Sequence, residues 1–159
     1  MRLPPEPANP IHETLLTFRE AVKYVVNWCI ENKIVNLAKA HHNLYYKLRD
    51  AYKLPARLAL DAVRQGIWIA KGWLRNPKRG RRPIIRRLSM VLTPNQSYSF
   101  SWTEASILTV KGRKTFPLVY VRRWHGKYRD WSVKEARLLP DRLNVVVERE
   151  VPISLLAIF

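Results

Sequence analysis

The spacing of the apolar residues changes near residue 76, and this change limits the folds that the chain can adopt. Before it, apolar side chains recur every three or four residues, as in amphipathic helices. After it, short alternating runs follow one another between turn signals, as in antiparallel strands. We therefore expect an α+β fold, with a helical lobe over residues 1–76 followed by a small antiparallel β domain over residues 88–151.

Three helices are expected in the helical lobe, over residues 12–34, 37–52 and 56–74. On the second helix, Leu37 and Leu44 share one apolar face and should point inward. On the third helix, small residues occupy the centre of the apolar face, where they would let another helix approach closely. These small residues are Ala59, Ala62 and Gly66.

Six strands are expected after residue 87, separated by turn signals rich in proline, glycine and asparagine. Tyr98, Phe100 and Trp102 alternate with serines, which is the period of two that a strand requires. Short antiparallel strands at this spacing indicate a small barrel or a sandwich. The expected strands cover residues 88–92, 98–102, 106–110, 115–121, 132–138 and 143–151.

The charge of the chain indicates a polyanionic partner. There are 29 Lys and Arg residues against 12 Asp and Glu residues, which gives a net charge of +17. Each phosphate that a basic residue neutralises releases counterions and adds affinity, so nucleic acid is the first candidate, and an anionic membrane surface is the second. The sequence shows neither a secretory leader nor an apolar run near the ~20 residues of a membrane span. We expect a cytoplasmic, nucleoid-associated protein without a membrane partner.

Basic side chains follow one stripe of the third expected helix. Arg57, Arg64, Lys71 and Arg75 lie within a narrow sector of the helical wheel, and Trp68 falls inside the same stripe. A large aromatic side chain among cations suits stacking on bases while phosphates pair with the cations. The alternative is a solvated charged face in which the tryptophan is buried against a neighbouring element.

A basic linker is expected over residues 77–87, between the helices and the strands. Its prolines and glycine disfavour a packed element, and its like charges repel one another unless a polyanion neutralises them. The linker could be only a solvated loop, but we favour contact with nucleic acid. The predicted nucleic-acid-binding residues are Arg57, Arg64, Trp68, Lys71, Arg75, Lys78, Arg79, Arg81, Arg82, Arg86 and Arg87.

Motifs for catalysis and metal binding are absent from the sequence. It contains no phosphate-binding glycine loop, no HExxH, no GxSxG and no paired CxxC. His41 and His42 are adjacent, so on a helix they point about 100° apart and do not chelate an ion. Cys29, the one cysteine, lies on the apolar face of the first helix, where we expect inert core packing. The sequence therefore predicts no enzymatic activity, no metal and no cofactor.

Residues 43–64, NLYYKLRDAYKLPARLALDAVR, resemble the LYY-x-LR-x-x-Y-x-LP signature of TnpB proteins. These are RNA-guided nucleases encoded by insertion sequences and associated with transposition. Residues 14–28 resemble the first recognition helix of the family, and residues 106–113 and 143–151 resemble strands of its wedge domain.

The resemblance implies a helical recognition lobe joined to a wedge barrel of the oligonucleotide-binding type. In the family these parts hold the guide RNA and read a short DNA motif, which would place Arg57, and less directly Arg64 and Lys71, near that DNA. The nuclease half of the family, with its catalytic carboxylates and zinc ribbon, has no counterpart here. We therefore expect an N-terminal portion of a TnpB-like protein, with an apolar tail over residues 152–159.

Three functions follow as hypotheses. The first is a non-catalytic module that binds structured RNA and DNA. The second is the recognition subunit of a split nuclease, which would assemble with a separately encoded nuclease half. The third is a basic protein-interaction or membrane-surface module, which lipid binding without nucleic-acid binding would favour.

Overall fold

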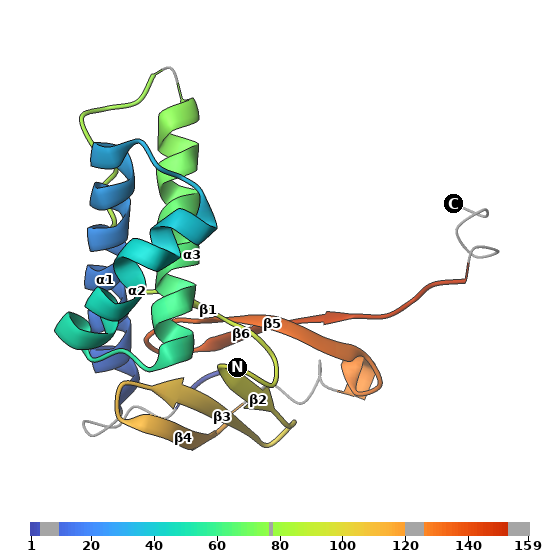
Figure 1. The fold of residues 1–159 in the computed structure, drawn as a ribbon. Helices are drawn as coiled ribbons and strands as arrows, with labels where there is room; N and C mark the ends of the chain where they lie inside the picture. Colours follow the sequence, from blue (N-terminus) through green and yellow to red (C-terminus); the bar gives the residue numbers. More distant parts are fainter. Residues whose placement is uncertain (4–9, 77, 120–125, 153–159) are drawn as a thin grey trace.

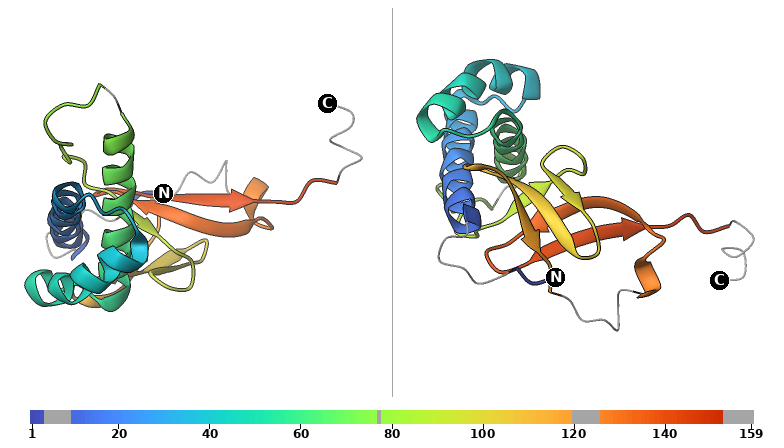
Figure 2. Two further views of the ribbon diagram at one scale, coloured as in Figure 1. Left: turned by 45° about the horizontal axis from the view of Figure 1, so that its top comes forward. Right: turned by 90° about the horizontal axis from the view of Figure 1, so that it is seen from below.

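The fold was obtained as a computed structural model, which describes residues 1–3, 10–76, 78–119 and 126–152 (Figure 1). Three helices precede two small antiparallel sheets, so the expected α+β class is confirmed. The helices lie together beside the sheets, and the hairpin of β5 (Ser132–Leu138) and β6 (Leu143–Glu148) extends away from them (Figures 1 and 2). The helices are α1 (Pro10–Asn32), α2 (Leu37–Tyr52) and α3 (Ala56–Arg75).

Local sequence explains where the second helix begins and ends. The Asn36 side chain accepts a hydrogen bond from the backbone N–H of Lys39 at 3.1 Å and caps the first turn of α2. Lys53, with a φ of 53°, ends the helix in the left-handed conformation. Leu37 is 40% exposed, so its expected inward position was wrong. It lies in the first turn of the helix, before Ala40, the first buried residue of α2.

A close approach of α1 and α3 holds the helical lobe together. A Cβ atom built on Gly66 of α3 would lie 2.4 Å from Cγ1 of Val25 on α1. No side chain larger than hydrogen fits this contact without a shift of the helices. The expected role of the small residues in α3 is therefore confirmed at Gly66, and Ala59 and Ala62 are buried on the same helix.

The strands form two three-stranded antiparallel sheets, in the orders β1-β5-β6 and β2-β3-β4. The β3–β4 turn is tighter than expected, because Gly112 already opens β4 with a φ of 88°. The first sheet contains β1 (Met90–Leu92), β5 (Ser132–Leu138) and β6 (Leu143–Glu148), and the second contains β2 (Tyr98–Phe100), β3 (Glu104–Thr109) and β4 (Gly112–Pro117).

The expected closed barrel is not what the described strands form. Arg2 forms two isolated β-bridges, one with Val119 after β4 and one with Arg142 before β6. These bridges connect the second sheet to the first. The strands β1 and β2 have three residues each, so they offer few ladder hydrogen bonds for closure. The β region is therefore two sheets joined by short bridges within the described residues.

One hydrophobic cluster runs through the helices and both sheets. The backbone N–H of Val110, after β3, donates to the Thr14 hydroxyl on α1 at 3.1 Å. The expected boundary near residue 76 therefore marks a change of secondary structure, while the core is shared across it. The tail expected over residues 152–159 falls outside the described residues except for Pro152.

None of the three described helices combines the length and the apolar character that crossing a membrane requires.

Candidate nucleic-acid interface

A groove with a volume of about 810 Å³ lies between α3, the basic linker and the first sheet. We call it the α3–linker groove. Its walls combine apolar and cationic side chains, and none of the described residues that line it is acidic. Its lining includes Trp68, Ile84, Arg86, Arg87, Val91 and Arg137.

Two large apolar side chains of the groove are open to solvent. Trp68 and Ile84 are each 74% exposed. The alternative in which Trp68 is buried against a neighbouring element is therefore wrong for this structure. Apolar surface of this size is unfavourable in water, and exposed apolar side chains that line a concave surface commonly mark a binding site.

The helix surrounds Trp68 with exposed cations. Arg64 lies one turn before it and Lys71 lies one turn after it, which are neighbouring positions on a helix surface. Arg75, one further turn along, is also exposed. The predicted basic stripe therefore continues from the rim of the groove along α3.

Arg57 lies away from the groove. Its guanidinium pairs with the Asp61 carboxylate at 3.1 Å, donates to the Thr93 hydroxyl at 3.0 Å, and also donates to the Gln96 side chain. Burial raises the pKa of Asp61, while the positive charge of Arg57 opposes that shift. The structure thus places Arg57 in a tie between α3 and the turn before β2.

Two arginines of the linker hold it against the helices. Arg79 lies 4.8 Å from the ring centroid of Trp73 and donates to the carbonyl of Leu74 at 3.1 Å. Arg82 donates to Asn27 at 3.1 Å and pairs with Glu31 at 3.2 Å. Both remain exposed, as do Lys78 and Arg81. This half of the linker is tethered by its own arginines.

The second half of the linker places the cations of the groove. The Arg19 guanidinium on α1 donates to the backbone carbonyl of Arg86 at 3.1 Å. This bond fixes the backbone where the linker passes α1, and the Arg86 and Arg87 side chains line the groove. The structure thus brings together three of the predicted residues: Trp68, Arg86 and Arg87.

Sequence analysis missed Arg137, the third arginine of the groove. It lies on β5 and is paired in register with Val91 of β1, which also lines the groove. The two residues are distant in the sequence, so only the strand pairing brings the arginine to this site. Ile84 lies inside the predicted linker, where only the basic residues were expected to bind, and it also lines the groove.

Cys29 lies apart from the groove. Cys29 is fully buried, and burial raises the pKa of its thiol to about 11, so the expected core role is confirmed. Within the described residues there is no group of three or more His, Cys, Asp or Glu side chains that could hold a metal ion.

Comparison with protein-family models finds none that matches the chain, and comparison with solved structures finds no significant match. The resemblance of residues 43–64 to TnpB proteins therefore stays a prediction. The function is inferred below from the residues and their geometry.

Proposed function

We propose that the protein is a nucleic-acid-binding module that holds structured RNA and DNA in the α3–linker groove. The observation that carries this proposal is the exposed Trp68 inside a groove whose described walls hold three arginines and no acidic residue. This pattern fits a ligand that combines flat apolar rings with negative charge.

Each part of the groove would act on a different part of the nucleic acid. Trp68 stacks on an unpaired base, an interaction worth roughly 1–3 kcal/mol. Arg86, Arg87 and Arg137 bind phosphates, for which the guanidinium fork is well suited. Stacking and phosphate contacts discriminate little between base sequences, so recognition would depend on the shape of the RNA.

An anionic membrane surface is the second candidate, because Trp68 and Ile84 are exposed beside cations, as in interfacial membrane segments. The groove favours nucleic acid, since its apolar side chains line a recess of about 810 Å³ between three elements. A membrane is bound more readily by a convex apolar face than by a recess.

The resemblance to TnpB proteins makes the proposal more specific. In that form, the protein is a transposition-associated, nucleoid-associated recognition module that binds RNA and DNA without cutting them. A separately encoded nuclease half is the partner that the split-nuclease alternative requires.

The test is the salt dependence of RNA binding, measured by fluorescence anisotropy with a labelled hairpin RNA. The triple variant Arg86→Gln, Arg87→Gln, Arg137→Gln should reduce the log–log slope by about 2–3, since each lost phosphate contact removes about 0.7–0.9. The matched control is Lys111→Gln, at the β3–β4 turn, where the lysine pairs with Glu13 at 3.3 Å.

Trp68→Ala separates stacking from charge, because it should weaken RNA binding severalfold while leaving the salt slope unchanged. An unchanged slope in the triple variant would overturn the groove as the binding site. Binding to phosphatidylserine vesicles without binding to RNA would support the membrane alternative instead.

A further inference from the structure

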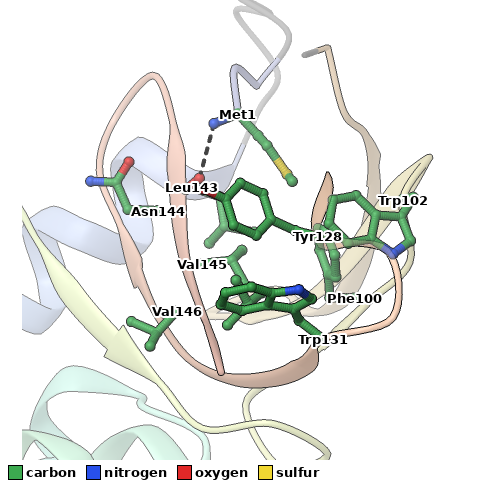
Figure 3. Close-up of a pocket in the computed structure, with 10 residues that line it drawn as sticks. Met1, Phe100, Trp102, Tyr128, Trp131, Leu143, Asn144, Val145 and Val146 are labelled. Atoms are coloured by element: carbon green, nitrogen blue, oxygen red, sulfur yellow. Dashed lines mark hydrogen bonds between the residues drawn. The ribbon is translucent and has the colours of Figure 1, made fainter. Parts of the chain in front are cut away.

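A second recess, with a volume of about 640 Å³, lies at the opposite edge of the first sheet, against β6 (Figure 3). We call it the aromatic pocket. Its volume is in the range of ligand-binding pockets, about 300–1,000 Å³. Four aromatic rings and the valines of β6 form its walls. The residues used here are Phe100, Trp102, Tyr128, Trp131, Asn144 and Val145.

The four rings come from two separate segments and form two edge-to-face pairs. The ring centroids of Phe100 and Trp102 are 5.3 Å apart, and those of Tyr128 and Trp131 are 5.0 Å apart. Figure 3 shows these side chains gathered around one space beside Val145. In an edge-to-face pair such as Tyr128 and Trp131, each ring keeps at least one face that the other ring of the pair does not cover.

Cations accompany the second pair of rings. The Arg149 guanidinium lies 5.2 Å from the ring centroid of Trp131, and the Lys127 ammonium lies 5.6 Å from that of Tyr128. None of the described residues that line the pocket is acidic. A cationic guest such as a quaternary ammonium would meet like charge here, whereas a flat neutral ring with an attached anion is complementary to both rings and cations.

The sheet places this pocket next to the α3–linker groove. Arg137, which lines the groove, is paired in register with Asn144, which lines the aromatic pocket. Directly opposed residues of antiparallel strands have Cα atoms about 5 Å apart. Side chains alternate along a strand, so Arg137 and Asn144 lie on one face of the sheet and Val145, beside the rings, lies on the other. One nucleic-acid chain can reach both sites by passing around β6, the edge strand of this sheet.

We propose that the aromatic pocket receives unpaired bases of a single-stranded segment that continues from the RNA in the groove. The bases stack on Trp131 and Tyr128, and Arg149 and Lys127 bind the phosphates on either side. This inference rests on the proposed function and deepens it, because it assigns the bound RNA a structured part and an unpaired extension.

The experiment compares two labelled RNAs, a blunt hairpin and the same hairpin with a short oligouridine tail. The wild-type protein should bind the tailed RNA at least fivefold more tightly than the blunt one. Trp131→Ala should abolish this tail advantage and leave the affinity for the blunt hairpin unchanged. The conservative variant Trp131→Phe should retain most of the advantage.

A second variant, Arg149→Gln, changes an exposed side chain and provides the test if Trp131→Ala fails to fold. It should lower the affinity for the tailed RNA severalfold. A tail advantage that is missing in the wild type, or that survives in Trp131→Ala, overturns the inference. The inference is also overturned if the tailed RNA binds more tightly only to a variant without residues 152–159, because that segment would then be the occupant of the pocket. If the wild-type protein does not bind the blunt hairpin at all, the proposed function itself is refuted.

Discussion

Replacing Gly66 with alanine should destabilise the protein by about 2 kcal/mol. Alanine favours a helix over glycine by roughly 1 kcal/mol. The new methyl group, however, would lie 2.4 Å from Cγ1 and 2.6 Å from Cβ of Val25. Rotating the valine side chain cannot move its Cβ, so α1 and α3 must separate. Overpacking of this kind typically costs about 1–3 kcal/mol, and we expect a value at or above the upper limit here.

Gly72 provides the matched control on the same helix. A Cβ atom added there meets nothing within 4 Å, so Gly72→Ala should stabilise the protein by about 0.5–1 kcal/mol. The two variants make the same chemical change and differ only in the space around it. Their free energies of unfolding should therefore differ by about 3 kcal/mol.

Urea unfolding followed by circular dichroism measures both values on the full chain. The expected order of midpoints is Gly72→Ala, then wild type, then Gly66→Ala. If Gly66→Ala is as stable as the wild type or more stable, α1 and α3 do not meet as described. The placement of Trp68, two residues further along α3, would then lose its support.

Two further predictions concern buried titratable groups. Arg57→Gln should cost about 2–3 kcal/mol at pH 7, because it leaves the buried Asp61 carboxylate without its cation. Burial raises the pKa of Asp61 in the folded protein. The folded variant therefore binds a proton more readily than the unfolded chain, and its free energy of unfolding falls as pH rises. The loss should therefore shrink toward pH 4 in urea titrations, and adding Asp61→Asn should remove this pH dependence. Cys29, with a pKa of about 11, should react with a thiol reagent at pH 8 only as fast as the protein unfolds, and fast modification of the folded protein would contradict its burial.

Local features made the helices predictable. The bounds of α2 follow from the Asn36 cap and from the Leu54-Pro55 pair, both of which act within a few residues. The strand at Tyr98–Phe100 was likewise visible as a period of two, whereas β4 begins at Gly112, three residues before its expected start. The error at Leu37 arose because periodicity describes a face of the helix and does not show how far along the helix the partner extends.

Pairing between strands was beyond the reach of local patterns. The neighbour of β1 is β5, and the strands between them form the other sheet. Nothing in the spacing of turns distinguishes this order from a closed barrel. Arg137 was missed for the same reason, because its approach to the groove depends on its register with Val91. The aromatic pocket also depends on such pairing, since its rings come from separate segments.

Charge counting identified the basic stripe and the linker but could not divide their cations by role. Arg57 pairs with Asp61, and Arg82 pairs with Glu31, whereas Arg87 lines the groove. The Arg57–Asp61 pair has the i,i+4 spacing that a helix alone brings together, whereas the partner of Arg82 is decided by the tertiary fold. The structure thus separates the arginines that pair with acidic side chains of their own chain from those that line the groove beside Trp68.

The most direct test of RNA binding in the α3–linker groove is the nucleic acid that copurifies with the protein. The wild-type protein and the Arg86→Gln, Arg87→Gln, Arg137→Gln variant are purified in parallel at low salt without nuclease treatment, and the bound material is then released with high salt. The wild type should carry RNA that high salt releases, and the variant should carry markedly less at equal yield of folded protein. A wild-type protein free of nucleic acid at low salt, or a variant that carries the same amount of RNA, would contradict it.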